Sequence, residues 1–152
     1  MDKITIIVPC YNEAEVVGRF YETVESVTAE IADAAFTYLF IDDGSRDNTL
    51  TAIRTLAEAH ANVRYISFTR NFGKEPAMMA GLDYADGDAV ILMDADLQHP
   101  PALIPEMVAQ WRAGYDDVCG KRTDRTDETW FKRTMANLFY RSMQAVSRFT
   151  LQ

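Results

Sequence analysis

Short apolar runs rich in β-branched residues alternate with helical patterns along this chain of 152 residues. The runs cover residues 4–8, 36–41, 63–68, 89–93 and 117–120. Between them, apolar residues recur at three- and four-residue spacing over 13–32, at Leu50, Ile53 and Leu56, over 75–84 and over 101–111. Asn48 and Pro101 are the types of residue expected where two of these helices begin. The alternation predicts a parallel, doubly wound α/β sheet flanked by helices.

The composition is that of a globular domain, with 48% apolar and 25% charged residues. It excludes the disordered and fibrous classes. No apolar run reaches the roughly 18 residues that a membrane-spanning helix needs. The Met-Asp-Lys start lacks the layout of a signal peptide, so we expect a cytosolic chain. Cys10 and Cys119 are too few for a disulfide framework, and we expect both to be reduced and buried.

The net charge of −8 is unevenly distributed. Residues 1–120 contain 8 basic and 20 acidic residues, whereas residues 121–152 contain 7 basic and 3 acidic residues. Nucleic-acid binding requires a basic surface that contacts phosphates. The acidic body therefore argues against a nucleic-acid partner, and the basic end needs a separate explanation.

Polar residues follow each apolar run, where a parallel sheet binds its ligands. They occupy residues 9–13, 42–45, 70–74, 94–96 and 121–122. The first of these segments lacks the glycine pattern of a dinucleotide-binding loop, and the chain has no Walker loop. Groups other than a glycine-rich phosphate-binding loop must therefore bind any anionic ligand.

The tripeptide Asp-x-Asp occurs twice, as Asp86 with Asp88 and as Asp94 with Asp96. A chain with 14 Asp is expected to contain such tripeptides by chance. The position of each pair relative to the apolar runs must therefore distinguish a functional pair from a chance one. The first pair precedes an apolar run and is typical of a turn. The second pair follows a run, at the ligand edge. It fits either a metal site or a solvated strand end with a helix-capping Asp.

Phosphates bound at that edge would face the carboxylates of Asp94 and Asp96. Two like charges about 4 Å apart cost about 4 kcal/mol at an effective dielectric constant of about 20. A divalent cation between the carboxylates and a diphosphate removes this repulsion. Mg²⁺ and Mn²⁺ prefer such oxygen ligands.

Four further side chains at the strand ends each allow two interpretations. Asp43 can accept hydrogen bonds from a nucleobase or ribose, or form a turn into the following glycine. Tyr11 can stack on a base or pack where its strand ends. Arg122 can neutralise a diphosphate or remain an exposed arginine, and His99 can be a ligand beside the carboxylate pair or a surface residue before a helix.

Taken together, the motifs are far more specific than any one of them. The chain contains Val-Pro-Cys-Tyr-Asn-Glu at 8–13, Ile-Asp-Asp-Gly-Ser-Arg-Asp at 41–47, Asn-Phe-Gly-Lys-Glu at 71–75, Asp-Ala-Asp-Leu-Gln at 94–98 and Gly-Lys-Arg at 120–122. In this order they resemble the family-2 inverting glycosyltransferases of the GT-A fold. The similarity is greatest to the polyprenyl-phosphate branch, which includes bactoprenol glucosyltransferases and dolichol-phosphate mannose synthases.

This resemblance implies a set of site residues. The nucleotide pocket is expected to be shaped by Pro9, Tyr11, Glu13, Ile41 and Asp43. Contacts to the sugar-nucleotide are expected from Asp94, Ala95 and Asp96, with Mg²⁺ or Mn²⁺ held by Asp94, Asp96 and Gln98. The catalytic set is expected to be Asp94, Asp96 and Arg122, with Arg122 on the diphosphate. His99 stands where the family pattern has Asp, which leaves its role open.

The resemblance also bears on domain organisation. It implies an incomplete nucleotide-sugar-binding domain over residues 1–127 and a basic amphipathic helix over 128–152. The apolar residues on one face of that helix are Phe131, Met135, Leu138, Phe139, Met143, Val146 and Phe149, with Lys132, Arg133, Arg141 and Arg148 around them. Such a helix can lie at a membrane interface or pack on the sheet. Together with the resemblance, it favours peripheral contact with the cytoplasmic face of the cell membrane.

The expected reaction moves a sugar from a nucleotide-sugar donor, with a UDP-sugar such as UDP-glucose favoured, to a polyprenyl-phosphate acceptor with inversion. Two alternatives stay open, namely a transferase with a soluble or polysaccharide acceptor and a non-catalytic sugar-nucleotide-binding module. Family members continue beyond the point where this chain ends, so we expect it to be part of a longer enzyme. A homo-oligomer also stays open.

Overall fold

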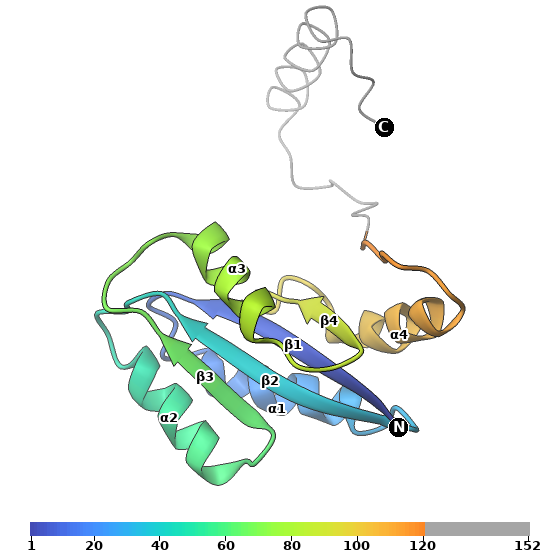
Figure 1. Cartoon of the computed structure of the whole chain (residues 1–152). Coiled ribbons are helices and arrows are strands. Elements are labelled where there is room, and N and C mark those ends of the chain that lie inside the picture. The colour runs from blue at the N-terminus through green and yellow to red at the C-terminus, as the bar shows by residue number, and fades with distance from the viewer. Residues whose placement is uncertain (121–152) are drawn as a thin grey trace, which may run out of the picture. The chain divides into compact units, whose positions relative to one another are not determined.

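Four parallel strands form a sheet with helices on both faces in the computed structural model, which describes residues 1–120 (Figure 1). The elements are β1 (Asp2–Cys10), α1 (Val17–Thr28), β2 (Ala34–Asp42), α2 (Thr49–Ala59), β3 (Val63–Ser67), α3 (Lys74–Tyr84), β4 (Ala89–Leu92), a 3₁₀ turn η1 (Pro101–Leu103) and α4 (Ile104–Arg112). Residues 1–118 form one compact unit, and Cys119 begins a second.

The strand order is β3-β2-β1-β4. The register places Ile6 of β1 opposite Tyr38 of β2 on one side and Ile91 of β4 on the other. The chain moves outward from β1 to β3 and then returns to place β4 on the free side of β1. The strand order therefore reverses between β1 and β4, and ligands bind in sheets of this kind at the carboxyl ends of two such strands.

The central strand β1 is buried on both faces, which explains its continuous apolar run. Ile4, Ile6 and Val8 pack in a core with apolar residues of α1, α2 and α4. Ile7 points to the opposite face, where it packs with Ala77 of α3. Figure 1 shows α3 on one face of the sheet and α1 on the other. The predicted doubly wound architecture is confirmed.

Three details of the sequence prediction are wrong. Residues 117–120 do not form a strand, and they pair with none of the four described strands. The helix expected over 13–32 is limited to α1, because side chains of the next loop hold the backbone of 12–14 outside a helix. Asn48 occupies the N-cap position of α2 without a capping hydrogen bond from its side chain. The carboxylate of Asp47 instead accepts the Thr49 N–H at 3.0 Å.

Two predicted features lie outside the described residues, namely Arg122 and the helix over 128–152. No helix within residues 1–120 has the length and apolar character needed to cross a membrane.

Candidate functional site

The loop after β1 is held by the loop that follows β2. The Asn12 N–H donates to Ser45 Oγ at 3.0 Å, and the Arg46 N–H donates back to Asn12 Oδ1 at 2.8 Å. The Glu13 N–H donates to Thr49 Oγ1 at 2.7 Å. These bonds fix the carboxyl end of β1 and with it the position of the Glu13 side chain.

The two adjacent aspartates at the end of β2 have different partners. Asp42 accepts the Ser45 N–H at 3.2 Å, so the turn considered for Asp43 belongs to Asp42. Asp43 is buried, and its two carboxylate oxygens accept the N–H groups of Phe72 and Gly73 at 2.7 and 2.9 Å. Asp43 thereby fixes the loop before α3. A carboxylate has about four acceptor positions, so it keeps acceptor capacity for a ligand.

An acidic cluster lies at the carboxyl ends of β1 and β4, where the strand order reverses. It consists of Glu13, Asp94 and Asp96. Burial, followed by the charges of Asp96 and Asp94, raises the pKa of Glu13 above its ordinary value. Glu13 Oε2 is buried without a hydrogen-bond partner. A buried acceptor of this kind is costly unless a ligand satisfies it.

Two residues with left-handed backbone flank this cluster. Asn12 follows β1 with φ of 56°, and Leu97 follows β4 with φ of 57°. Asn tolerates this conformation, whereas Leu adopts it rarely. Asp96 Oδ1 accepts the Gln98 N–H at 3.0 Å across the turn that contains Leu97. Strained backbone of this kind is concentrated at functional sites, and here it directs the segment from Asp94 to Gln98.

The acidic cluster fits a divalent cation that also binds a phosphate ligand. Within residues 1–120, no three His, Cys, Asp or Glu side chains form a ready-made metal cage. Mg²⁺ is commonly held by one or two carboxylates together with substrate phosphates. Asp94 and Asp96 offer such carboxylates, the Gln98 side chain offers an amide oxygen, and the neighbouring Glu13 Oε2 has no hydrogen-bond partner.

The other predicted site residues lie in differing environments. Ile41 and Ala95 are completely buried in the two cores, so they are packing residues beneath the loops of the site. Pro9 is half-buried, and Tyr11 is exposed at 40%. Gln98 and His99 are exposed next to Asp96.

Sequence reasoning missed the partner of Asp94. The Lys74 ammonium, at the start of α3, lies 2.6 Å from Asp94 Oδ1 and 2.8 Å from Oδ2. A lysine at the first helical position is unfavourable for the helix dipole. That position was a signal that a carboxylate should lie nearby.

Cys10 lies beside the acidic cluster and is chemically quiet. Burial, followed by the charge of Glu13, raises the pKa of its thiol well above the ordinary value. A thiol in these surroundings stays protonated and is neither a nucleophile nor a metal ligand. The expected burial is confirmed for Cys10 and is wrong for Cys119, which is exposed.

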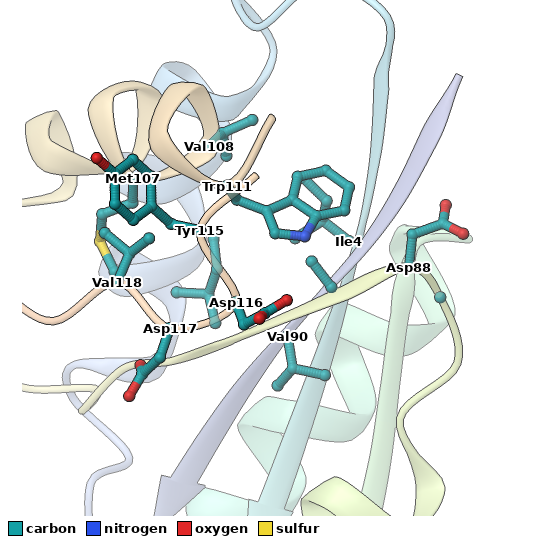
Figure 2. Close-up of a pocket in the computed structure, with 13 residues that line it drawn as sticks. Ile4, Asp88, Val90, Met107, Val108, Trp111, Tyr115, Asp116, Asp117 and Val118 are labelled. Carbon is teal, nitrogen blue, oxygen red and sulfur yellow. The ribbon is translucent and has the colours of Figure 1, made fainter. Parts of the chain in front are cut away.

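A cavity lies at the opposite end of β4, beside its amino-terminal residues (Figure 2). It is lined by Ile4, Val90, Trp111 and residues 115–118, among others. The polar loops described above do not contribute to it. The acidic cluster, rather than this cavity, is therefore the candidate functional site.

Solved structures with the same architecture define the class of protein. A mannosyltransferase of Pyrobaculum calidifontis, PcManGT, solved with GDP-Man and Mn²⁺, superposes with a TM-score of 0.62 at 26% identity over 80% of this chain and 36% of its own. Residues 1–349 of S. aureus TarS superpose with a TM-score of 0.54 at 23% identity over 70% of this chain and 33% of that one, which shows the fold alone. The fold is that of the GT-A glycosyltransferases.

The chain belongs to glycosyl transferase family 2, whose sequence profile matches residues 5–151. It is 46% identical over 145 residues to the bactoprenol glucosyl transferase of Shigella phage SfV. It is 45% identical over 145 residues to a prophage bactoprenol glucosyl transferase homolog of Escherichia coli K12. Each alignment covers 95% of this chain and 47% of the relative. The chain thus spans about half the length of these curated relatives.

Proposed function

We propose that this chain is the donor-binding part of a glycosyltransferase that moves a sugar from a nucleotide-sugar to a polyprenyl phosphate with inversion. The observation that carries the proposal is the acidic cluster at the reversal of strand order, with its unpartnered Glu13 oxygen. UDP-glucose is the favoured donor, because the relatives at 45–46% identity are named glucosyl transferases.

The proposed donor site uses the residues implied by the family resemblance. Asp94, Asp96 and Gln98 hold Mg²⁺ or Mn²⁺, with Arg122 on the diphosphate. The nucleotide lies against Pro9, Tyr11, Glu13 and Asp43, above Ile41 and Ala95. PcManGT, which shares the fold, was solved with a GDP-sugar and Mn²⁺, which supports both a nucleotide-sugar and a divalent cation here.

The proposed chemistry is a single displacement at the anomeric carbon. An oxygen of the lipid phosphate forms the new bond as the bond from the sugar to the nucleoside diphosphate breaks, and a single displacement inverts the configuration. A divalent cation bound at the carboxylates supplies charge stabilisation for the leaving diphosphate. Asp94 and Asp96 orient the donor, and Arg122 adds a second positive charge. The second pKa of a phosphate monoester is about 6, so the acceptor is already ionised at neutral pH and needs no strong general base.

The proposed acceptor and location depend on the relatives and on the basic end of the chain. Bactoprenol is the acceptor that the relatives' names print. Residues 121–152 carry 7 basic and 3 acidic residues, which suits the anionic cytoplasmic face of a membrane. We therefore place the basic end, in particular 128–152, at the membrane surface and the donor site in residues 1–127.

Isothermal titration of the chain with UDP-glucose and with GDP-mannose, each with and without Mn²⁺, tests the donor site. We expect one donor to bind only with metal and Asp96→Ala to weaken that binding at least about tenfold, as for the loss of a charge-assisted contact. Asp86→Ala is the matched control, because Asp86 is also an exposed aspartate but precedes β4. A folded wild-type chain that binds neither donor with Mn²⁺, or an equal loss in both variants, would refute the proposal.

A further inference from the structure

Lys74 lies in the Asn-Phe-Gly-Lys-Glu segment at 71–75, and the proposed function gives it no role. It is the first residue of α3, where the helix dipole repels its charge. Its ammonium contacts both carboxylate oxygens of Asp94, at 2.6 and 2.8 Å. Lys74 is therefore paired with Asp94, whose carboxylate the proposed metal site requires.

Within residues 1–120, Lys74 is the only lysine or arginine that forms an ion pair with the acidic cluster. The other described ion pair joins Arg112 to Asp2, at the amino-terminal end of β1. Glu13, Asp94 and Asp96 thus share one positive charge. Glu13 Oε2 remains without a partner, which indicates that a single ammonium does not satisfy the cluster.

A divalent cation and the ammonium cannot share the face of Asp94 that Lys74 now contacts. The metal lies about 2.0–2.1 Å from its oxygen ligands, and two cations on one carboxylate repel each other. The Lys74 side chain can move away, because 54% of it is exposed and its stem is flexible. If the metal at Asp94 also held a diphosphate, the displaced ammonium would have phosphoryl oxygens nearby as alternative partners.

We propose that Lys74 is an exchangeable counterion of Asp94, which a divalent cation displaces and which then binds the diphosphate of the nucleotide-sugar. This inference rests on the proposed function, because it places the donor and its metal at the same carboxylates. It assigns Lys74 two opposite effects. It opposes metal binding when no nucleotide is present, and it strengthens nucleotide binding when the metal is present.

The test is Mn²⁺ binding to the full chain, measured from the electron paramagnetic resonance signal of free Mn²⁺, without and with UDP. Without UDP, Lys74→Met should bind Mn²⁺ about two- to fivefold more tightly than wild type, which is the range of a partly exposed ion pair. With Mn²⁺ saturating, the same variant should bind UDP about tenfold more weakly, as for a lost charge-assisted hydrogen bond. Lys74→Gln repeats both measurements with a polar side chain of similar length, and circular dichroism verifies that each variant is folded.

Lys3→Met is the matched control, because it removes the same charge from an exposed position on β1, away from the cluster. It should leave both affinities unchanged. A lysine that only anchored α3 to β4 would not change the two affinities in opposite directions. Mn²⁺ binding that is unchanged or weaker in both Lys74 variants overturns this inference. A wild-type chain that binds Mn²⁺ but no nucleotide overturns the proposed function instead, so the two failures are distinguishable.

Discussion

Glu13 carries a carboxylate in surroundings that oppose its charge. Burial, then Asp96 and Asp94, raise its pKa above the ordinary 4.5. Between pH 4.5 and this raised pKa, the folded state binds more protons than the unfolded chain. The contribution of Glu13 to the free energy of unfolding is therefore fully present below pH 4.5 and is lost as the pH rises through the raised pKa.

We expect Glu13→Gln to unfold at a higher temperature than wild type at pH 7 without metal. The expected gain is about 2–4 °C for each kcal/mol recovered. Calorimetric melts in EDTA at several pH values measure it, and the gain should shrink toward pH 4.5. Glu15→Gln is the matched control, because it removes a carboxylate from an exposed neighbouring position, and it should not raise the melting temperature. A gain that did not depend on pH would contradict the assignment to the Glu13 charge.

Residue types alone could predict part of the site. The position of Asp94 and Asp96 after an apolar run predicted that they follow the carboxyl end of a strand, and the structure confirms that they follow β4. The partners of Asp43, and which carboxylate Lys74 pairs with, could not be predicted, because these contacts join segments about 20–30 residues apart. A periodic sequence pattern predicts which face of a helix or strand is apolar, but it does not predict which loops contact each other.

At the scale of elements, the apolar runs predicted four strands that the structure contains. The strand predicted at 117–120 was wrong because a strand requires a neighbouring strand to pair with. Sequence periodicity does not show whether such a neighbour is available. The predicted start of the first helix at residue 13 was wrong for a related reason. Side chains of Ser45, Asp47 and Thr49 bind the backbone of 12–14, and these long-range bonds override local helical preference.

The contact between α3 and β1 depends on a glycine. A Cβ at Gly81 would lie 2.3 Å from Ile7 Cγ2, so a side chain there cannot be accommodated without movement. We expect Gly81→Ala to lower the free energy of unfolding by about 1–3 kcal/mol, as in other overpacked cores. Urea denaturation with an unchanged slope measures the loss.

The double variant Gly81→Ala/Ile7→Ala should lose less stability than the sum of the two single variants, because Ile7→Ala removes the methyl group that the new Cβ meets. Gly18 in α1 is the matched control. A Cβ there would have no neighbour within 4 Å, so Gly18→Ala should stabilise the chain by up to about 1 kcal/mol through helix propensity. Additive effects of Gly81→Ala and Ile7→Ala would show that the two positions do not collide.

The whole molecule combines an acidic part, residues 1–120, with a basic end, residues 121–152. Residues 1–120 contain 20 acidic and 8 basic residues, so this part is repelled by anionic lipid. The 7 basic residues of 121–152 oppose that repulsion. A cation near an anionic membrane contributes about 1 kcal/mol, so a few of them suffice to hold the chain at the surface. The proposed lipid acceptor gives this charge distribution a use, because a chain held at the membrane surface is close to its lipid substrate.

We expect the chain to float with vesicles that contain anionic lipid and to be released at high salt, because screening removes the attraction. Replacing Lys132, Arg133, Arg141 and Arg148 with Gln should weaken binding by about fivefold per residue at low salt. The matched control replaces one lysine and three arginines at exposed positions of the acidic part, Lys3, Arg19, Arg54 and Arg64, with Gln. If charge in general attracted the chain to lipid, both sets would weaken binding equally. If the basic end makes the contact, only the first set will weaken it, and binding of UDP with Mn²⁺ will be unaffected.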